Sequence, residues 1–163
     1  ICSSFSDGIV CVANYNSPSQ VVISGDIKAV SSASSAIKDA GALKVVELNV
    51  SGAFHSPLMS NAKDTLHEYL LNMEINDTSF PVYTNFSSEP VSLKAEIQLA
   101  LLNQIENPVL WHDIIKRMFE DGINTAVEIG PSKVLQGLSK RINRSLIMYG
   151  AESYEDILNL NNV

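Results

Sequence analysis

The sequence predicts an α/β fold, and three observations lead to that prediction. Strand-like and helix-like segments alternate through residues 51–163, which is typical of a mostly parallel sheet whose strands are joined by helices. Residues 8–50 show the order strand, strand, helix, strand. The chain has 163 residues, 45% hydrophobic and 18% charged, so it can bury a core and has the composition of an ordinary globular protein.

The first part of the chain predicts a hairpin, a helix and a third strand. Residues 8–16 and 21–25 are rich in β-branched side chains, and the short turn SPSQ between them favours a hairpin. Asp26 is a suitable N-cap for the helix that follows, and Gly41 is a suitable stop. Residues 43–50, LKVVELNV, are expected to form the next strand.

The second part begins with a helix start at Ser56-Pro57, since serine favours the N-cap and proline the first helical position. The expected elements, in order, are helix 57–73, strand 80–86, helix 92–105, a helix from Asn107-Pro108 to Gly122, strand 124–130, helix 131–142, strand 145–150 and helix 153–160. The change of pattern near residue 50 divides the chain into residues 1–50 and 51–163.

Charge and composition exclude several classes of function. A net charge of −7 argues against nucleic acid as a partner, and no apolar run is long enough to cross a bilayer. Cys2 and Cys11 match no metal or redox spacing, so they are expected to be buried free thiols in a reducing compartment, the cytoplasm. The chain opens on Ile1 without signal-peptide features, and we expect it to be a piece of a longer protein.

Of the three histidines, His55 has the setting of a catalytic base, and a structural histidine is its alternative role. It lies at a predicted strand-to-helix turn, and such turns project over the sheet edge where α/β proteins bind ligands. His67 is expected on the polar side of its helix, and His112 is expected to be structural. No G-x-S-x-G elbow is present, and GPSKV at 130–134 lacks the second glycine. No metal-ligand spacing or phosphate-binding glycine loop occurs either, so the sequence offers a base without a nucleophile.

Four segments in this order carry a resemblance to a known family. They are VANYNSPSQVVISG (12–25), GAFHSPLM (52–59), NPVLW (107–111) and VEIGPSKVLQGLSKRI (127–142). Together they strongly resemble the malonyl-CoA:acyl-carrier-protein transacylases of fatty acid biosynthesis, and the related acyltransferase domains of polyketide synthases. The likeness extends over essentially the whole chain.

The resemblance implies a two-part fold of which this chain holds a portion. Residues 1–50 correspond to part of a ferredoxin-like small subdomain, and residues 51–163 to the C-terminal part of an α/β-hydrolase-like large subdomain. The family's first half carries the nucleophilic serine, the oxyanion-hole amides and an arginine for the malonyl carboxylate. These groups are missing here, so the chain by itself is expected to be inactive.

The resemblance also implies roles for individual residues. His55 corresponds to the base that takes a proton from the serine and returns it to the departing thiol, and the backbone carbonyl of Gln104 corresponds to the group that orients it. The partners implied are malonyl-CoA, as substrate, and acyl carrier protein. No cofactor, metal, nucleic acid or membrane is implied.

Three further residues are implied to contact substrate. Phe54 corresponds to a pocket residue that disfavours an extra α-methyl group, and a core aromatic is its alternative role. Asn14 and Asn16 correspond to asparagines that approach the active site, and turn chemistry before Ser17-Pro18 is the alternative for both, most of all for Asn16.

Residues 132–144 contain four basic side chains and no acid, in a chain that is acidic overall. A solvated helix face is one interpretation, and a docking patch for the strongly acidic carrier protein is the other. The basic residues are Lys133, Lys140, Arg141 and Arg144.

Two rival functions stay open at this point. The chain could be a fragment of a polyketide synthase acyltransferase domain, which the motifs do not separate from the fatty-acid enzyme. It could also be a non-catalytic, truncated interaction module.

Overall fold

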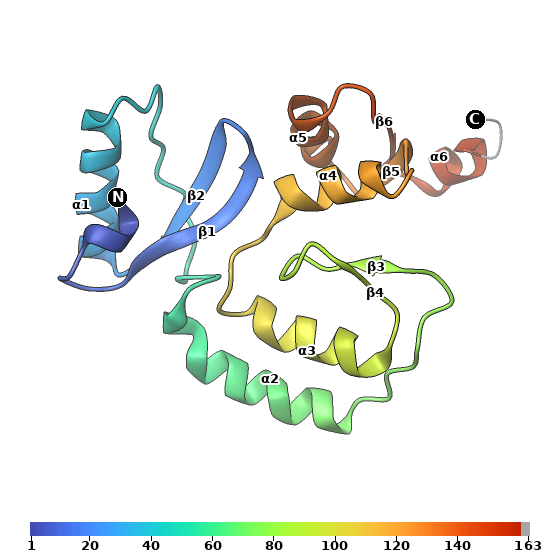
Figure 1. Ribbon diagram of the computed structural model, residues 1–163, viewed down its shortest axis with the longest axis horizontal. Coiled ribbons are helices and arrows are strands. Elements are labelled where there is room, and N and C mark those ends of the chain that lie inside the picture. The colour runs from blue at the N-terminus through green and yellow to red at the C-terminus, as the bar shows by residue number, and fades with distance from the viewer. Residues whose placement is uncertain (161–163) are drawn as a thin grey trace.

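The computed structural model describes residues 1–160, and Figure 1 shows an open arrangement of short sheets and helices. In chain order the elements are η1 (Cys2–Ser4), β1 (Val10–Ser17), β2 (Gln20–Gly25), α1 (Ile27–Asp39), η2 (Pro57–Met59), α2 (Ser60–Asn72), β3 (Val82–Tyr83), β4 (Pro90–Val91), α3 (Lys94–Gln104), α4 (Trp111–Glu120), β5 (Thr125–Ile129), α5 (Val134–Ile142), β6 (Ile147–Ala151) and α6 (Tyr154–Asn159). The strands form three two-stranded sheets.

The predicted hairpin is present. Strands β1 and β2 pair antiparallel from Val10↔Gly25 to Ser17↔Gln20, and α1 covers the hairpin (Figure 1). Gly25 has φ +154, and a Cβ there would stand 1.9 Å from the Ile9 carbonyl oxygen, so only glycine fits. A small core forms between hairpin and helix from the buried residues Val10, Ala29 and Ala33, with Cys2, Phe5, Ile23 and Val30 packed against them.

Asp26 is the N-cap residue of α1, as predicted, but its side chain does not cap the helix. Its carboxylate instead accepts a hydrogen bond from the Ile9 backbone N–H at 2.7 Å, which fixes the chain just before β1. Helix α1 ends at Asp39, and Gly41 follows with φ +102, the left-handed conformation expected of a glycine stop.

The prediction of a strand at residues 43–50 is wrong. These residues have no regular secondary structure, and all five of their apolar side chains are exposed, from Val45 at 40% to Leu43 at 105%. A strand needs a neighbour for its backbone N–H and C=O groups, and none of residues 1–160 pairs with this segment. The pattern is therefore that of a strand whose partner is not among the described residues.

Helices α2 and α3 lie side by side (Figure 1), and the Gln98 side chain links them by donating to the Leu70 carbonyl at 3.2 Å. The buried strand predicted at residues 80–86 shrinks to the half-buried β3. It stops because residues 84–88 turn back, with the Ser88 N–H bonded to the Thr84 carbonyl at 2.9 Å, to form β4.

The C-terminal part contains the parallel pairing that the alternating pattern predicts. Strands β5 and β6 pair parallel from Thr125↔Ile147 to Ile129↔Ala151, and α5 connects them. Residues 107–110 are held beside β1, so α4 starts at Trp111 rather than at Asn107-Pro108 as predicted. The helix predicted at 57–73 begins with the 3₁₀ turn η2 and becomes α-helical at Ser60.

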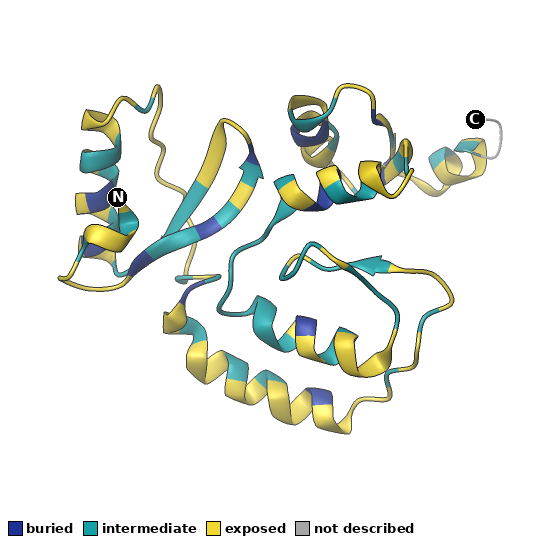
Figure 2. Ribbon diagram, in the orientation of Figure 1, coloured by how far each residue is buried: buried dark blue, intermediate teal, exposed yellow. Residues whose placement is uncertain are grey.

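The core is small for the length of the chain, and Figure 2 shows buried positions scattered among exposed ones. The accessible surface is 10856 Å², whereas a compact monomer of 17.7 kDa has about 8,000 Å². Exposed apolar side chains contribute to this surface, among them Ile129, Val134 and those of residues 43–50. None of the helices in residues 1–160 is long and apolar enough to span a bilayer.

Candidate active site

His55 stands in a tight turn just before η2, not after a strand as predicted. Its φ is +58, a left-handed conformation that costs a non-glycine residue about 1–3 kcal/mol. Hydrogen bonds on both sides hold the turn. The fully buried Ser56 hydroxyl donates to the Ala53 carbonyl at 2.6 Å and accepts from the Leu58 N–H at 3.3 Å. Ser56 is thus the N-cap that the sequence predicts, and it fixes the backbone that carries His55.

The His55 ring is oriented by the end of helix α3. Nδ1 lies 2.9 Å from the Gln104 carbonyl oxygen, the contact that the family resemblance implies. Gln104 is the last residue of α3, and the last carbonyls of a helix lack partners within the helix. A carbonyl oxygen only accepts, so Nδ1 carries the hydrogen, and Nε2 of the neutral ring has the lone pair of a proton acceptor.

The Gln104 side chain holds the turn that follows α3. Its Nε2 donates to the Asn107 carbonyl at 3.1 Å, and it also lies 3.3 Å from His55 Nδ1. Both of these nitrogens carry hydrogens when Nδ1 donates to the carbonyl. We therefore assign the hydrogen bond to the shorter contact, and the amide–imidazole contact is packing.

The segment after Gln104 is fastened to β1. The Val109 N–H donates to the Ala13 carbonyl at 2.8 Å, and the Tyr15 N–H donates to the Val109 carbonyl at 2.9 Å. These bonds form a parallel bridge between Asn14 and Val109. From the same strand, the Cys11 thiol reaches the His55 carbonyl at 3.7 Å. Strand β1, the His55 turn and the end of α3 therefore meet at one place.

Asn14 and Asn16 both lie on β1 and are half-buried. Neither side-chain amide makes a hydrogen bond within residues 1–160, so Asn16 does not perform the turn chemistry that was its alternative role. Phe54 is 47% exposed, and its ring lies over Gly52, where a Cβ would stand 3.4 Å from ring Cζ. Phe54 is therefore not part of the core that residues 1–160 form.

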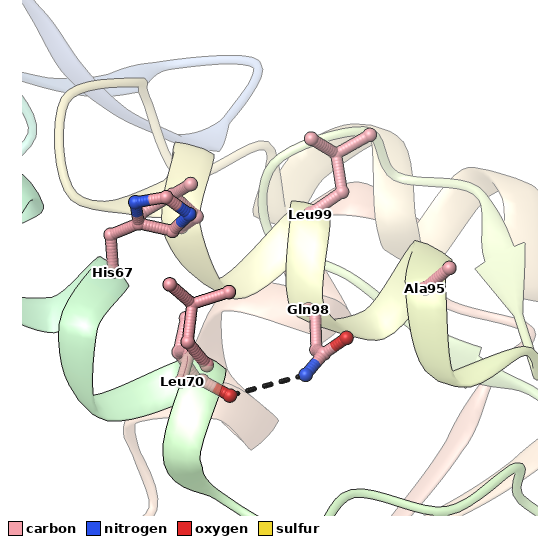
Figure 3. Close-up of a pocket in the computed structure, with 7 residues that line it drawn as sticks. His67, Leu70, Ala95, Gln98 and Leu99 are labelled. Carbon is pink, nitrogen blue, oxygen red and sulfur yellow. Dashed lines mark hydrogen bonds between the residues drawn. The ribbon is translucent and has the colours of Figure 1, made fainter.

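The two other histidines lie elsewhere. His67 is exposed on α2 and lines a groove of about 220 Å³ between α2 and α3, with apolar neighbours such as Leu70 and Leu99 (Figure 3). His112 contacts the Asp113 carboxylate at 3.1 Å. Among the described residues no group of three or more His, Cys, Asp or Glu side chains could hold a metal ion.

The predicted basic patch divides into two parts. Lys133, Lys140 and Arg144 line one groove of about 430 Å³ beside α5. Arg141 points elsewhere, and its guanidinium donates to the Gln20 side chain on the hairpin at 2.8 Å. Lys133 has a distant partner, Glu152, at 3.9 Å.

The carboxylate that positions α5, Glu128, was not predicted from the sequence. Glu128 on β5 is 6% exposed and accepts from the backbone N–H groups of Leu135 and Gln136 and from the Ser132 hydroxyl, each at 3.0 Å. Burial acts to raise the pKa of Glu128, but these hydrogen bonds outweigh it and lower the pKa. Helix α5 begins at Val134 because this carboxylate caps it there, rather than at Pro131 as predicted.

Replacing Glu128 by glutamine is expected to lower the free energy of unfolding at pH 7 by about 1–3 kcal/mol, because a buried charged acceptor is lost. The folded pKa lies below the unfolded value of about 4.3, so the contribution is complete above that value and disappears as pH falls through the folded pKa. Urea unfolding of both proteins from pH 7 downward measures this. Glu120→Gln, at an exposed position, is the control, and a difference independent of pH would contradict the assignment.

Comparison with known proteins gives a consistent result. A model of the acyl transferase domain matches residues 3–156. The malonyl CoA-acyl carrier protein transacylase of Bacillus subtilis is 43% identical over 138 residues, 85% of this chain and 44% of the relative. The Haemophilus influenzae protein of the same name is 38% identical over 95% of this chain and 49% of its own length.

Solved structures agree with these relatives. The acyl-carrier-protein S-malonyltransferase from Bartonella henselae superposes with a TM-score of 0.94 at 34% identity, over 99% of this chain and 52% of that one. A malonyl-transacylase in complex with a type II polyketide acyl-carrier protein gives 0.93 at 36% identity, over 99% and 53%. The chain thus spans about half the length of the proteins it matches.

Proposed function

Because the chain belongs to the acyl transferase domain family, we propose that it is the C-terminal part of an enzyme that moves a malonyl group from coenzyme A to the phosphopantetheine thiol of acyl carrier protein. The observation that carries this proposal is the 2.9 Å bond between His55 Nδ1 and the Gln104 carbonyl. It fixes the tautomer in which Nε2 accepts a proton. The names of the relatives support the donor and the acceptor.

In the proposed reaction His55 handles one proton in each half. Nε2 takes the proton of a serine hydroxyl as that oxygen attacks the malonyl thioester, and the departing coenzyme A thiolate receives the proton. In the second half Nε2 takes the proton of the carrier thiol as its sulfur attacks the malonyl ester, and the serine oxygen recovers it. The Gln104 carbonyl, at the negative end of the α3 dipole, stabilises the imidazolium that forms between these steps.

We place the serine on polypeptide outside these 163 residues. His55 Nε2 makes no hydrogen bond to any of residues 1–160, and the sequence has no G-x-S-x-G elbow. The apolar surface exposed by residues 43–50 supports this placement, since burying apolar area of that extent is favourable. A strand from the rest of the domain would also supply the backbone partners that this segment lacks.

We assign residues 1–50 to a small, ferredoxin-like subdomain and residues 51–163 to the C-terminal part of an α/β-hydrolase-like subdomain. The separate small core between hairpin and α1 supports the first assignment, and the β5–α5–β6 unit supports the second. Both cysteines are free thiols, which fits a reducing compartment such as the cytoplasm.

Phe54, Asn14 and Asn16 are proposed to contact substrate. Phe54 immediately precedes the base and is half-exposed, so its ring can line the acyl pocket. Asn14 and Asn16 lie on the strand that holds both the His55 turn and Val109. Their amides are free to bind polar groups of the thioester.

Replacing Phe54 by serine in the complete enzyme is expected to raise the kcat/KM ratio of methylmalonyl to malonyl thioester about tenfold, because the added methyl group gains space. Competition between the two thioesters measures the ratio directly. Phe80→Ser, at another exposed phenylalanine, is the matched control. An unchanged ratio in Phe54→Ser would remove this residue from the pocket.

Formation of the malonyl-enzyme ester tests the function itself. Incubated with malonyl-CoA, the 163-residue chain is expected to show no covalent malonyl group by mass spectrometry. A polypeptide that also includes the serine-bearing half should show one, which acyl carrier protein then removes. The intact Bacillus subtilis relative is the positive control. An adduct on the short chain, or none on the longer one, would contradict the proposal, and the second result would favour a non-catalytic module.

A second candidate keeps the same chemistry with another acceptor. One of the similar structures is a malonyl-transacylase bound to a type II polyketide carrier protein, so a polyketide carrier is the alternative acceptor. Comparing the rates at which the two classes of carrier discharge the malonyl-enzyme distinguishes them.

A further inference from the structure

A second polar contact links the two elements that carry His55 and Gln104. Lys63 on α2 donates to the Glu106 carboxylate at 2.6 Å, and the two side chains are 27% and 21% exposed. Lys63 lies in the first turn of α2, the helix that follows the His55 turn, and Glu106 lies two residues after Gln104. The ion pair and the His55–Gln104 hydrogen bond therefore connect the same two structural elements.

Helix stability alone does not account for these charges. A positive side chain near the N-terminus of a helix and a negative one just past a C-terminus both oppose the helix dipole. Lys63 stands at the unfavourable end of α2, and Glu106 at the unfavourable end of α3. Because α2 starts where α3 ends, each charge neutralises the other, and the benefit arises only when the two helix ends are held together.

Hydrogen bonds hold residues 103–107 together, so a displacement of Glu106 also displaces the Gln104 carbonyl. The Glu106 N–H donates to the Asn103 carbonyl at 3.3 Å, and the Asn107 side chain donates to the same carbonyl at 2.8 Å. The Gln104 amide bonds to the Asn107 carbonyl at 3.1 Å. Glu106 and the Gln104 carbonyl thus belong to one small hydrogen-bonded unit.

We propose that the Lys63–Glu106 ion pair is a positioning device for the His55–Gln104 hydrogen bond. It holds the start of α2 against the end of α3, so that the Gln104 carbonyl stays in reach of Nδ1 and Nε2 stays the proton acceptor. The catalytic consequence of this positioning rests on the proposed function. The effect of the ion pair on the His55 tautomer does not rest on the proposed function.

The test is the tautomer of His55, measured by ¹⁵N NMR on the full 163-residue chain at a pH where the ring is neutral. Lys63→Met and Glu106→Gln are expected to shift His55 several-fold from the Nδ1–H toward the Nε2–H form. The charge-swapped double variant K63E/E106K should restore the wild-type ratio. Glu89→Gln is the matched control, because it breaks another 2.6 Å ion pair, that with Arg117 on α4, which involves neither α2 nor the end of α3.

Unchanged tautomer ratios in Lys63→Met and Glu106→Gln would overturn the proposal, and so would an equal shift in Glu89→Gln. Glu106→Asp keeps the charge but shortens the side chain by one methylene, so it covers the case in which the neutral variants do not fold. It should give a smaller shift in the same direction, and no shift would overturn the proposal.

Activity measurements distinguish a failure of the positioning role from a failure of the proposed function. In the complete enzyme, Glu106→Gln should lower kcat about 3–10-fold with little change in KM for malonyl-CoA, because the base is misoriented while substrate contacts remain. An enzyme without transferase activity that still shows the tautomer shift would refute the proposed function and leave the positioning role intact.

Discussion

Replacing His55 by alanine in the complete enzyme is expected to lower kcat for malonyl transfer by about 10²–10⁴-fold, the usual contribution of a general base. The serine would lose its proton acceptor, whereas the groups proposed to contact substrate would remain. KM for malonyl-CoA should therefore change little. Single-turnover formation of the malonyl-enzyme, followed by rapid quench and mass spectrometry, measures the step directly.

His67→Ala is the matched control for this substitution. His67 is exposed on α2 and makes no hydrogen bond to His55 or Gln104 within residues 1–160, so its loss should leave kcat unchanged. If His55→Ala kept kcat within threefold of the wild-type value, His55 would be a structural histidine and the 2.9 Å bond to Gln104 would serve only the fold.

Charge reversal in the groove beside α5 is expected to weaken carrier binding. We propose that Lys140 and Arg144 dock the acidic carrier protein, because both line that groove and neither makes an ion pair within residues 1–160. The double variant K140E/R144E should raise KM for the carrier about tenfold at low salt and reduce the dependence on ionic strength. KM for malonyl-CoA should hardly change.

Lys28→Glu on α1 reverses one charge away from the groove and is the control for the single variant Lys140→Glu (Figure 1). Arg141→Glu should have a smaller effect than Lys140→Glu, because the Arg141 guanidinium is engaged with Gln20. Equal increases in KM for both substrates would indicate a folding defect, and an unchanged KM for the carrier in K140E/R144E would place docking elsewhere.

The elements that the sequence predicts well are those set by local patterns. The hairpin and α1 follow from β-branched runs, the short turn SPSQ and the glycine stop at Gly41. The strand at 43–50 fails because pairing depends on a neighbour that no local pattern contains. The start of α5 was misplaced for a related reason, since Glu128 caps it from a neighbouring strand.

The site shows the same limit. His55 can be singled out from its turn, but the orienting group is a backbone carbonyl, and nothing in the sequence around Gln104 marks it apart from the family resemblance. Neighbouring Lys140 and Arg141 look equivalent in the sequence, yet helix geometry sends them to different surfaces. Lys63 and Glu106 are 43 positions apart, and the only signal is that each charge opposes its own helix dipole.

The two backbone hydrogen bonds between β1 and Val109 limit the hinge motions open to this protein. The hairpin cannot rotate away from α3 without breaking both bonds or carrying residues 107–110 with it. Gln104 is bonded to Asn107, so such a rotation pulls on the residue whose carbonyl holds the imidazole. Rotation of the β1–β2 hairpin is therefore coupled to the orientation of His55.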